Sequence, residues 1–244
     1  MRFVLVCLLA LGSTSSAVAQ GLARPHAELP SDDQPARNVP TTSYTLSLSW
    51  APEYCHGARG QRAADPECRP AVQRAGFTLH GLWPDGAGED RWPQYCHPVE
   101  ILTDAQIGAG RANTPSPQLL QHEWAKHGSC MGNDPVRYFN EEARLYRQIT
   151  IPPIARLARK DGITAGEIAD AFARANPKLP AAAIRVHVNK KGWLDEIWLC
   201  LDRDRRFAAC VAGQGGGADA GVPVRIETAF GRGYARGKAS TDRP

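Results

Sequence analysis

The chain has 244 residues, of which 43% are hydrophobic and 22% are charged, and its formal net charge is +4. These values are ordinary for a folded soluble protein and argue against a largely disordered chain. The mild positive charge permits a polyanionic partner but does not require one.

Residues 1–19 have the pattern of a secretory signal peptide. Arg2 supplies a positive charge, residues 3–11 form a short apolar run, and the small residues 17–19 precede a cleavage point before Gln20. The run is too short to span a bilayer, and no later segment could span one. A buried N-terminal helix is the alternative interpretation. We therefore expect a secreted or periplasmic protein that is not attached to a membrane after cleavage.

The remainder of the chain divides into three parts. Residues 20–43 carry Pro and Asp without apolar periodicity, which predicts a flexible leader. Residues 44–212 have the patterns of one folded domain. Residues 213–244 begin with "GQGGGADAG" and end with "GRGYARGKASTDRP", which predicts a Gly-rich loop and a basic C-terminal segment.

Six cysteines remain after signal cleavage, which would remove Cys7. They are Cys55, Cys68, Cys96, Cys130, Cys200 and Cys210. An even number in an exported chain indicates disulfides formed in an oxidising compartment. Proximity favours pairing the first two and the last two, which leaves Cys96–Cys130, a closure that stabilises the fold by about 3–4 kcal/mol. A zinc site is the alternative, but no pair has the C-x-x-C spacing.

The first elements along the domain are two strands. Residues 43–50, "SYTLSLSW", alternate in polarity and predict a half-buried strand. Residues 75–86, "AGFTLHGLWPDG", predict a short strand that breaks at Gly81 and turns at Pro84, so that His80 stands at the end of the strand.

Three helices and a hairpin follow. The stretch "HEWAKHGSC", residues 122–130, fits a helix ending near Gly128. Asp134 and Pro135 predict the start of a helix that reaches about residue 148, and Thr164 with Glu167 forms a capping-box signature for another. Residues 183–188 and 193–201 predict the two strands of a hairpin. Strands and helices do not alternate regularly, which favours an α+β domain.

The stretch "HEWAKHGSC" resembles the H-E-x-x-H signature of zinc proteases but differs from it in spacing. His122 and His127 are five residues apart, so on a helix they lie roughly 140° apart, against roughly 40° for the i,i+4 pair that chelates zinc. No further ligand set stands nearby in the sequence. We therefore expect no metal and no cofactor at this stretch.

The same helical geometry places four polar side chains on one face. They are His122, Glu123, Lys126 and His127, whereas Trp124 and Ala125 point away from this face. Because Glu123 and His127 are an i,i+4 pair, the carboxylate is expected to support the imidazole. A solvated polar helix face is the alternative interpretation of these four residues.

A second polar stretch favours a functional site over a merely solvated helix face. "FTLHGLWPD" presents His80, Trp83 and Asp85 around a constrained strand end. With His127 it supplies two imidazoles that could act on one reacting group, as general acid–base catalysis requires. Trp83 could stack on a nucleobase and Asp85 could accept a hydrogen bond from its edge. A core tryptophan and a turn aspartate are the alternatives.

At these two stretches the sequence resembles the ribonuclease T2 family. "FTLHGLWPD" matches the family's first active-site motif and "LLQHEWAKHGSC" its second, and the resemblance extends over about residues 44–210. It implies an α+β fold, with helices packed on a mainly antiparallel sheet stapled by disulfides. It implies that residues 44–212 are a catalytic ribonuclease domain, most simply a monomer, that cleaves single-stranded RNA without a metal ion through a 2′,3′-cyclic phosphate. A non-catalytic RNA- or partner-binding protein on the same scaffold is the alternative.

The resemblance also assigns roles to the polar residues. It makes His127 the base that takes the 2′-hydroxyl proton and His80 the acid that protonates the departing 5′-oxygen. Glu123 and Lys126 would stabilise the transition state, and His122 would help to bind the phosphate. The family places base contacts near Trp83 and Asp85, with Trp92 and Tyr95 as further aromatic candidates. Its disulfides support Cys96–Cys130 and Cys200–Cys210, while Cys55–Cys68 rests on proximity.

Overall fold

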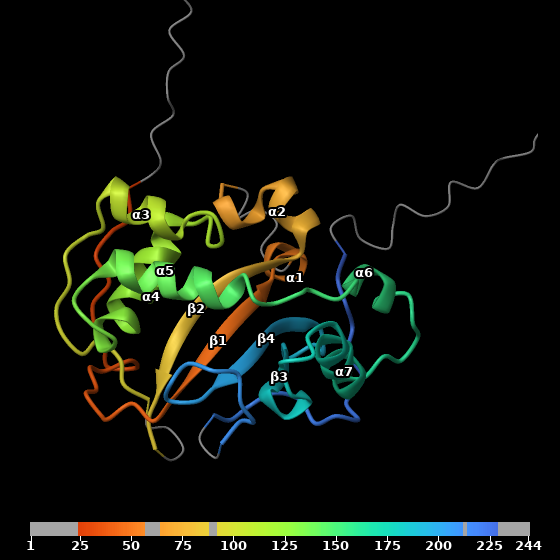
Figure 1. Ribbon diagram of the computed structural model, residues 1–244. Helices are drawn as coiled ribbons and strands as arrows, with labels where there is room; N and C mark the ends of the chain where they lie inside the picture. The colour runs from red at the N-terminus through yellow and green to blue at the C-terminus, as the bar shows by residue number, and fades with distance from the viewer. Residues whose placement is uncertain (1–23, 57–63, 88–91, 212–213, 229–244) are drawn as a thin grey trace, which may run out of the picture.

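The computed structural model describes residues 24–56, 64–87, 92–211 and 214–228. The predicted signal peptide, the first residues of the predicted leader and most of the predicted basic C-terminal segment lie outside these residues. Within them a four-stranded antiparallel sheet has the strand order β2-β1-β4-β3 (Figure 1). The strands are β1 (Ser43–Trp50), β2 (Phe77–Asp85), β3 (Ile184–Val188) and β4 (Leu194–Leu201). The predicted α+β class is confirmed.

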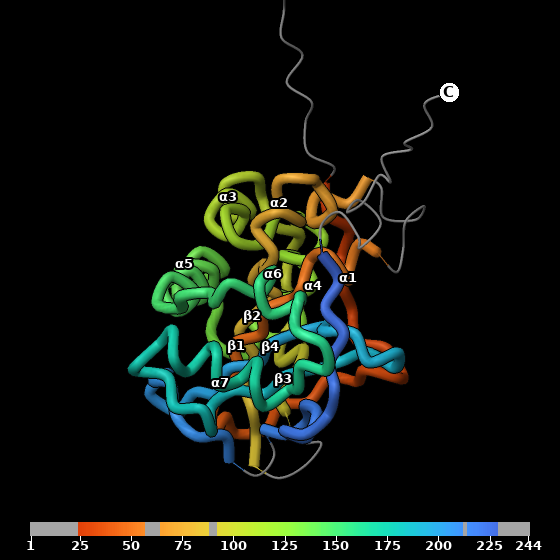
Figure 2. Tube along the Cα trace, turned by 90° about the vertical axis from the view of Figure 1, so that its right-hand side faces the viewer, coloured from red at the N-terminus to blue at the C-terminus, as the bar shows by residue number. Residues whose placement is uncertain are grey.

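Helices pack against both edge strands of the sheet. The described α-helices are α1 (Ala51–His56), α2 (Pro70–Ala75), α3 (Asp104–Gly110), α4 (Pro117–Lys126), α5 (Pro135–Tyr146), α6 (Ile154–Leu157) and α7 (Ala165–Ala175). Helices α4 and α5 contact β2, and α7 contacts β3. Figure 2 views the molecule from the α7 side, with α3, α4 and α5 beyond it. None of the helices described is long and apolar enough to cross a membrane.

The two helices whose starts the sequence predicts, α5 and α7, begin at the expected residues. Asp134 accepts hydrogen bonds from two backbone N–H groups at the start of α5, and Thr164 and Glu167 form the expected capping box of α7. Helix α4 starts after Ser116, whose hydroxyl caps it, and ends at Lys126, close to the predicted end. The predicted hairpin is present as β3 and β4.

Strand β2 carries a β-bulge at His80. Ser47 of β1 pairs with Gly81, but the next residue, Leu48, pairs with Leu79, so His80 is an extra residue in β2. The prediction that this strand breaks at Gly81 is therefore wrong, because β2 continues to Asp85. A bulge absorbs the irregularity without ending the strand.

The bulge decides which way His80 points. Side chains alternate between the two faces of a strand, so regular pairing would place His80 on the same face as Leu82, which is fully buried in the core. The extra residue restores Leu79 to the core face and turns His80 toward the opposite face, where it lines a cleft. A single inserted residue thus converts a core position into a site position.

The outer edge of β2 is covered by side chains instead of by another strand. The backbone N–H of Leu82 donates to the carboxyl of Glu142 at 2.9 Å, and its carbonyl accepts from the hydroxyl of Tyr138 at 3.0 Å. The hydroxyl of Thr114 donates to the carbonyl of Leu79 at 2.7 Å. These contacts satisfy backbone groups that an edge strand would leave unpaired, and they fix β2 against α5.

Segments on both sides of the predicted domain pack against it. In the predicted leader, the backbone of Arg37 pairs with that of Gln94. Residues 214–228, which the sequence predicts to lie beyond the domain, contribute Val224 and Ile226 to the hydrophobic core, and the indole of Trp50 donates to the carbonyl of Glu227. The packed domain therefore extends past residue 212.

Three disulfides join the described cysteines, in the pairs favoured by proximity. They are Cys55–Cys68, Cys96–Cys130 and Cys200–Cys210. The second of them lies beside the site described next.

Candidate active site

The polar residues that the sequence singles out meet in one cleft, with a volume of about 670 Å³. All seven predicted catalytic and substrate-binding side chains line it: His80, Trp83, Asp85, His122, Glu123, Lys126 and His127. The cleft is also lined by Thr45, Trp92, Trp198, Gln214, Gly215 and Gly216. The fold thus brings together β2 and α4, which are about 40 residues apart in the sequence.

His80 lies between two carboxylates. Its Nδ1 is 2.5 Å from Oε1 of Glu196 on β4, and its Nε2 is 3.4 Å from Oε1 of Glu123 on α4. Burial alone would lower the pKa of His80, but the negative charges of Glu123 and Glu196 outweigh this effect and raise the pKa well above its usual value. The imidazole is therefore held as an imidazolium ion that can donate a proton.

Glu123 is almost completely buried and faces His80. Its Oε2 accepts a hydrogen bond from the indole N–H of Trp83 at 2.7 Å. Burial is the largest single effect and would raise its pKa, but the neighbouring groups together, the charge of His80 foremost, lower the pKa to about 2. The helical spacing predicts that this carboxylate supports His127, but in the structure it faces His80 instead. Gly81, next to His80, leaves space for it. A Cβ atom on Gly81 would lie 1.9 Å from Oε2 of Glu123.

His127 stands at the end of α4 in the opposite electrostatic environment. Its side chain is buried, its ring stacks on Trp83 with 5.3 Å between ring centroids, and its Nδ1 has no hydrogen-bond partner among the described residues. Burial, assisted by the charge of Lys126, lowers the pKa of His127 to about 3. The ring is therefore a neutral imidazole that can accept a proton. Neighbouring groups whose pKa values are pushed apart in this way are suited to act as an acid and a base.

Lys126 and His122 add an amine and a third imidazole to the cleft. Burial lowers the pKa of Lys126, although the carboxylates of Glu123 and Glu28 oppose this effect. Nδ1 of His122 lies 3.4 Å from Oε2 of Glu28, and Gln118 donates to the other oxygen of Glu28 at 2.6 Å. The sequence does not indicate this contact, because Glu28 belongs to the predicted flexible leader. In Figure 1 this part of the chain, drawn red, passes α3 and α4 before entering β1.

Trp83 and Asp85 line the cleft in different ways. The ring of Trp83 contacts both histidines, stacked on His127 and edge-on to His80 at a centroid distance of 5.1 Å. Oδ2 of Asp85 accepts from the hydroxyl of Thr45 at 2.8 Å and from the amide of Gln214 at 3.1 Å. Burial raises the pKa of Asp85 to about 6, despite these hydrogen bonds. Trp83 thus braces the two imidazoles, and Asp85 is held at the cleft wall.

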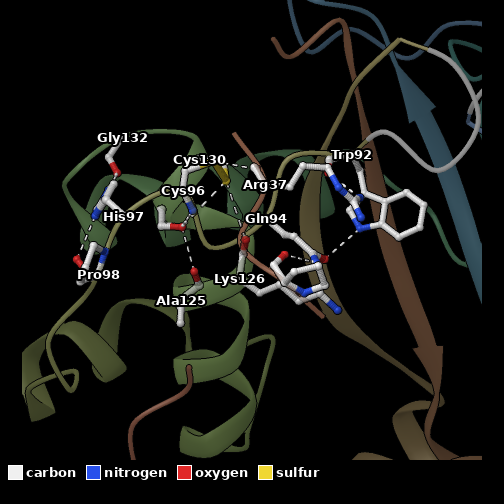
Figure 3. Close-up of a disulfide and its surroundings, with 12 residues drawn as sticks. Arg37, Trp92, Gln94, Cys96, His97, Pro98, Ala125, Lys126, Cys130 and Gly132 are labelled. Atoms are coloured by element: carbon white, nitrogen blue, oxygen red, sulfur yellow. Dashed lines mark hydrogen bonds between the residues drawn. A yellow bond between two sulfur atoms is a disulfide. The ribbon is translucent and has the colours of Figure 1, made fainter. Parts of the chain in front are cut away.

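Trp92 forms the exposed aromatic wall of the cleft. Its side chain is 39% exposed, the guanidinium of Arg37 lies 5.2 Å from its ring centroid, and its indole N–H donates to Gln94 (Figure 3). The other aromatic candidate, Tyr95, is buried and does not line the cleft. Its backbone N–H donates to the carbonyl of Lys126.

The disulfide Cys96–Cys130 ties this wall to the end of α4. The backbone N–H of Cys96 also donates to the hydroxyl of Ser129, which in turn donates to the carbonyl of Ala125 (Figure 3). The covalent link therefore connects the loop that follows Trp92 with the turn that follows His127.

Several residues at the site are absent from the sequence predictions, among them Glu196, which contacts His80, and the cleft-lining Trp198 and Gln214. Glu196 and Trp198 come from β4, and Gln214 from the Gly-rich loop. In the sequence, Glu196 is distinguished only as a charged residue within a predicted strand. Its contact with His80 can be inferred only when the strand register is known. Within the described ranges, no group of three or more His, Cys, Asp or Glu side chains is placed to hold a metal ion.

Comparison with known proteins supplies independent evidence. A family model described as "Ribonuclease T2 family" matches residues 41–210, which is more than half of the chain. A probable ribonuclease of Haemophilus influenzae is 26% identical over 182 residues, which are 70% of this chain and 62% of that protein. Ribonuclease I of Escherichia coli is 30% identical over 142 residues, which are 43% of this chain and 53% of the relative. Each match spans less than two thirds of the relative's length.

Solved structures show the same fold. Trichomaglin, described as a novel S-like ribonuclease, superimposes with a TM-score of 0.57 at 19% identity, over 75% of this chain and 98% of the other. RNase NT in complex with 5′-AMP gives a TM-score of 0.54 at 21% identity, over 76% of this chain and 98% of the other. At these identities the likeness concerns the fold.

Proposed function

The chain belongs to the ribonuclease T2 family, and on this basis we propose that it is an endoribonuclease that cleaves single-stranded RNA without a metal ion. Cleavage proceeds by transphosphorylation to a 2′,3′-cyclic phosphate, which is then hydrolysed to a 3′-phosphate end. The observation that carries the proposal is the pair of imidazoles in one cleft, His80 and His127, whose pKa values are shifted in opposite directions.

In the first step the 2′-oxygen of the substrate attacks the adjacent phosphorus. The neutral His127 takes the proton from the 2′-hydroxyl, and the imidazolium of His80 gives a proton to the 5′-oxygen as the phosphorus–oxygen bond breaks. The products are a cyclic phosphate and a 5′-hydroxyl end. In the second step water replaces the 2′-hydroxyl as nucleophile, and the two histidines exchange roles. RNA carries its own nucleophile, so this chemistry does not need a metal-bound water.

The side chains of Lys126 and His122 stabilise the phosphorane-like transition state. Charge accumulates on the phosphoryl oxygens during attack, and Lys126 and His122 line the cleft where that charge develops. Glu123 acts differently. Its negative charge is already paired with His80, so it keeps the acid protonated and adds little repulsion toward the phosphate.

The cleft walls suggest how a base is held. Trp92 presents an exposed ring on which a base can stack, whereas one face of Trp83 is already covered by His127. Asp85 can meet the edge of a base, and its raised pKa allows it to donate as well as accept in mildly acidic solution.

The proposed location is the periplasm or the exterior of the cell. The sequence pattern of residues 1–19 and the three disulfides both support export to an oxidising compartment. A monomer remains the simplest prediction for the oligomeric state.

Product analysis tests the function directly. Purified mature protein incubated with single-stranded RNA in the presence of EDTA should yield fragments with 2′,3′-cyclic phosphate ends that convert slowly to 3′-phosphates, as identified by mass spectrometry. Full loss of activity with EDTA that zinc restores would contradict the metal-independent mechanism. RNA binding without turnover would support the alternative of a non-catalytic binding protein.

The pH dependence of kcat/KM should be a wide bell. Below the pKa of His127, about 3, the base becomes protonated and the rate falls as pH decreases. Above the raised pKa of His80 the acid loses its proton and the rate falls as pH increases. The active ionisation state therefore predominates across the mildly acidic range. Rates measured from pH 3 to 9 on an oligonucleotide, with circular dichroism to monitor folding, would check this. A profile without an alkaline decline would contradict the role of His80.

A further inference from the structure

A polar row crosses the sheet on the side of the cleft, and the mechanism above gives no role to Glu196, which lies at one end of this row. The row comprises His80 on β2, Ser47 and Ser49 on β1, and Glu196 on β4. We propose that Glu196 is a positioning residue that fixes the ring of His80 so that Nε2 is the nitrogen presented to the RNA. This inference rests on the proposed ribonuclease function.

Every contact of the Glu196 carboxylate comes from a potential hydrogen-bond donor. Oε1 accepts from Nδ1 of His80 at 2.5 Å and from the hydroxyl of Ser49 at 3.0 Å. Oε2 accepts from the indole N–H of Trp198 at 2.6 Å and from the hydroxyl of Ser47 at 3.2 Å. Three groups besides the imidazole therefore fix the carboxylate, which is the arrangement expected of a carboxylate that orients a histidine.

The orientation of the ring follows from this contact. With Nδ1–H donated to Glu196, the proton available for catalysis is the one on Nε2. Nε2 faces Glu123, which lies on the opposite side of the ring and also lines the cleft. Glu196 and Glu123 thus hold the imidazolium from two sides.

The reach of Glu196 depends on the small residues of β1. Neighbouring strands are about 4.8 Å apart, so β2 and β4 are separated by roughly 10 Å. Glu196 spans this gap because the intervening side chains on that face, Ser47 and Ser49, are short and end in hydroxyl groups. The bulge in β2 supplies the other half of the arrangement by turning His80 to the same face.

The charge of His80 also lowers the pKa values of several ionisable groups on other elements. They are Glu123 and His127 from the α4 region, Glu67 from the 3₁₀ turn Pro66–Cys68, and Glu142 from α5. Of these, Glu123 also lies within ion-pair distance of the ring. Removal of the Glu196 charge should therefore lower the pKa of His80 without abolishing the effect of Glu123.

The central experiment compares Glu196→Gln with wild type and with Glu141→Gln. Glu141 is a matched control, because it also accepts hydrogen bonds from two side chains, but these partners, Arg144 and Arg205, do not line the cleft. We expect kcat to fall about 10²-fold for Glu196→Gln and the alkaline limb of kcat/KM to move to lower pH. Affinity for an all-2′-deoxy oligonucleotide should stay within about threefold. Glu196→Asp should not rescue kcat, because the shorter side chain cannot reach across β1.

A merely structural role predicts a different pattern. In that case Glu196→Gln would lower the melting temperature but leave kcat and the alkaline limb at their wild-type values, which would overturn the inference. A measurement on the wild-type protein avoids dependence on folding of the variant. In ¹⁵N-histidine NMR spectra, Nδ1 of His80 should stay protonated and hydrogen-bonded above the ordinary pKa of histidine, and a ring that titrates at or below that value would also overturn it. If wild type and Glu141→Gln both fail to cleave RNA, the proposed function itself fails.

Discussion

Replacing His127 with alanine should reduce kcat for RNA cleavage by about 10²–10⁴-fold, the usual contribution of a general base. His127 is buried and neutral, and among the described histidines that line the cleft it is the one whose pKa is depressed. Lys126 cannot substitute, because as an ammonium ion it has no lone pair to accept a proton. Single-turnover rates on a defined oligonucleotide would measure the loss separately from binding.

His80→Ala should cause a loss of similar size, and the double variant should lose far less than the product of the two single losses, because an acid and a base in one step act as a unit. His97→Ala is the matched control. Its imidazole contacts the carbonyls of Pro98 and Gly132 and does not line the cleft. Circular dichroism spectra should remain those of the wild type in all variants. A folded His127→Ala or His80→Ala protein with wild-type kcat would remove that residue from the mechanism.

An RNA oligonucleotide with a single 2′-deoxyribose on the 5′ side of the scissile phosphate should not be cut at that linkage. The substitution removes the only nucleophile of the first step and leaves the phosphate charge and both bases in place. Binding should therefore persist, while cleavage at the modified linkage falls below detection. Gel analysis would display this directly, since the unmodified linkages of the same strand serve as internal controls.

A deoxyribose on the 3′ side of the scissile phosphate should have little effect on the cleavage rate at that phosphate. Cleavage of single-stranded DNA at a rate comparable to RNA would be incompatible with attack by the 2′-oxygen. It would point instead to an external water nucleophile and reopen the interpretation of the two histidines.

Local signals in the sequence predict much of the fold. Asp134 and Thr164 start helices at the expected residues, because capping depends on neighbours three or four residues away. The hairpin of β3 and β4 is similarly local. Two long motifs carry the seven predicted site residues, and the fold places all seven in one cleft.

Other parts of the site depend on contacts that no local pattern encodes. The pairing of His80 with Glu196 joins residues 116 positions apart, and it requires a bulge that alternation rules cannot anticipate. Glu123 on α4 turns toward His80 and away from His127 because Gly81, next to His80 on β2, leaves room for its carboxylate. Helical spacing alone favoured the wrong partner, since it contains no information about the facing strand.

The Cys96–Cys130 bond has a consequence for the cell that makes this protein. Its own transcripts and ribosomes reside where glutathione and thioredoxin keep thiols reduced, so a chain still inside would lack this covalent link. The aromatic wall and the end of the catalytic helix would then be joined by hydrogen bonds alone. Under the proposed function, full assembly of the cleft is coupled to arrival in an oxidising environment, so that ribonuclease activity would mature only after export.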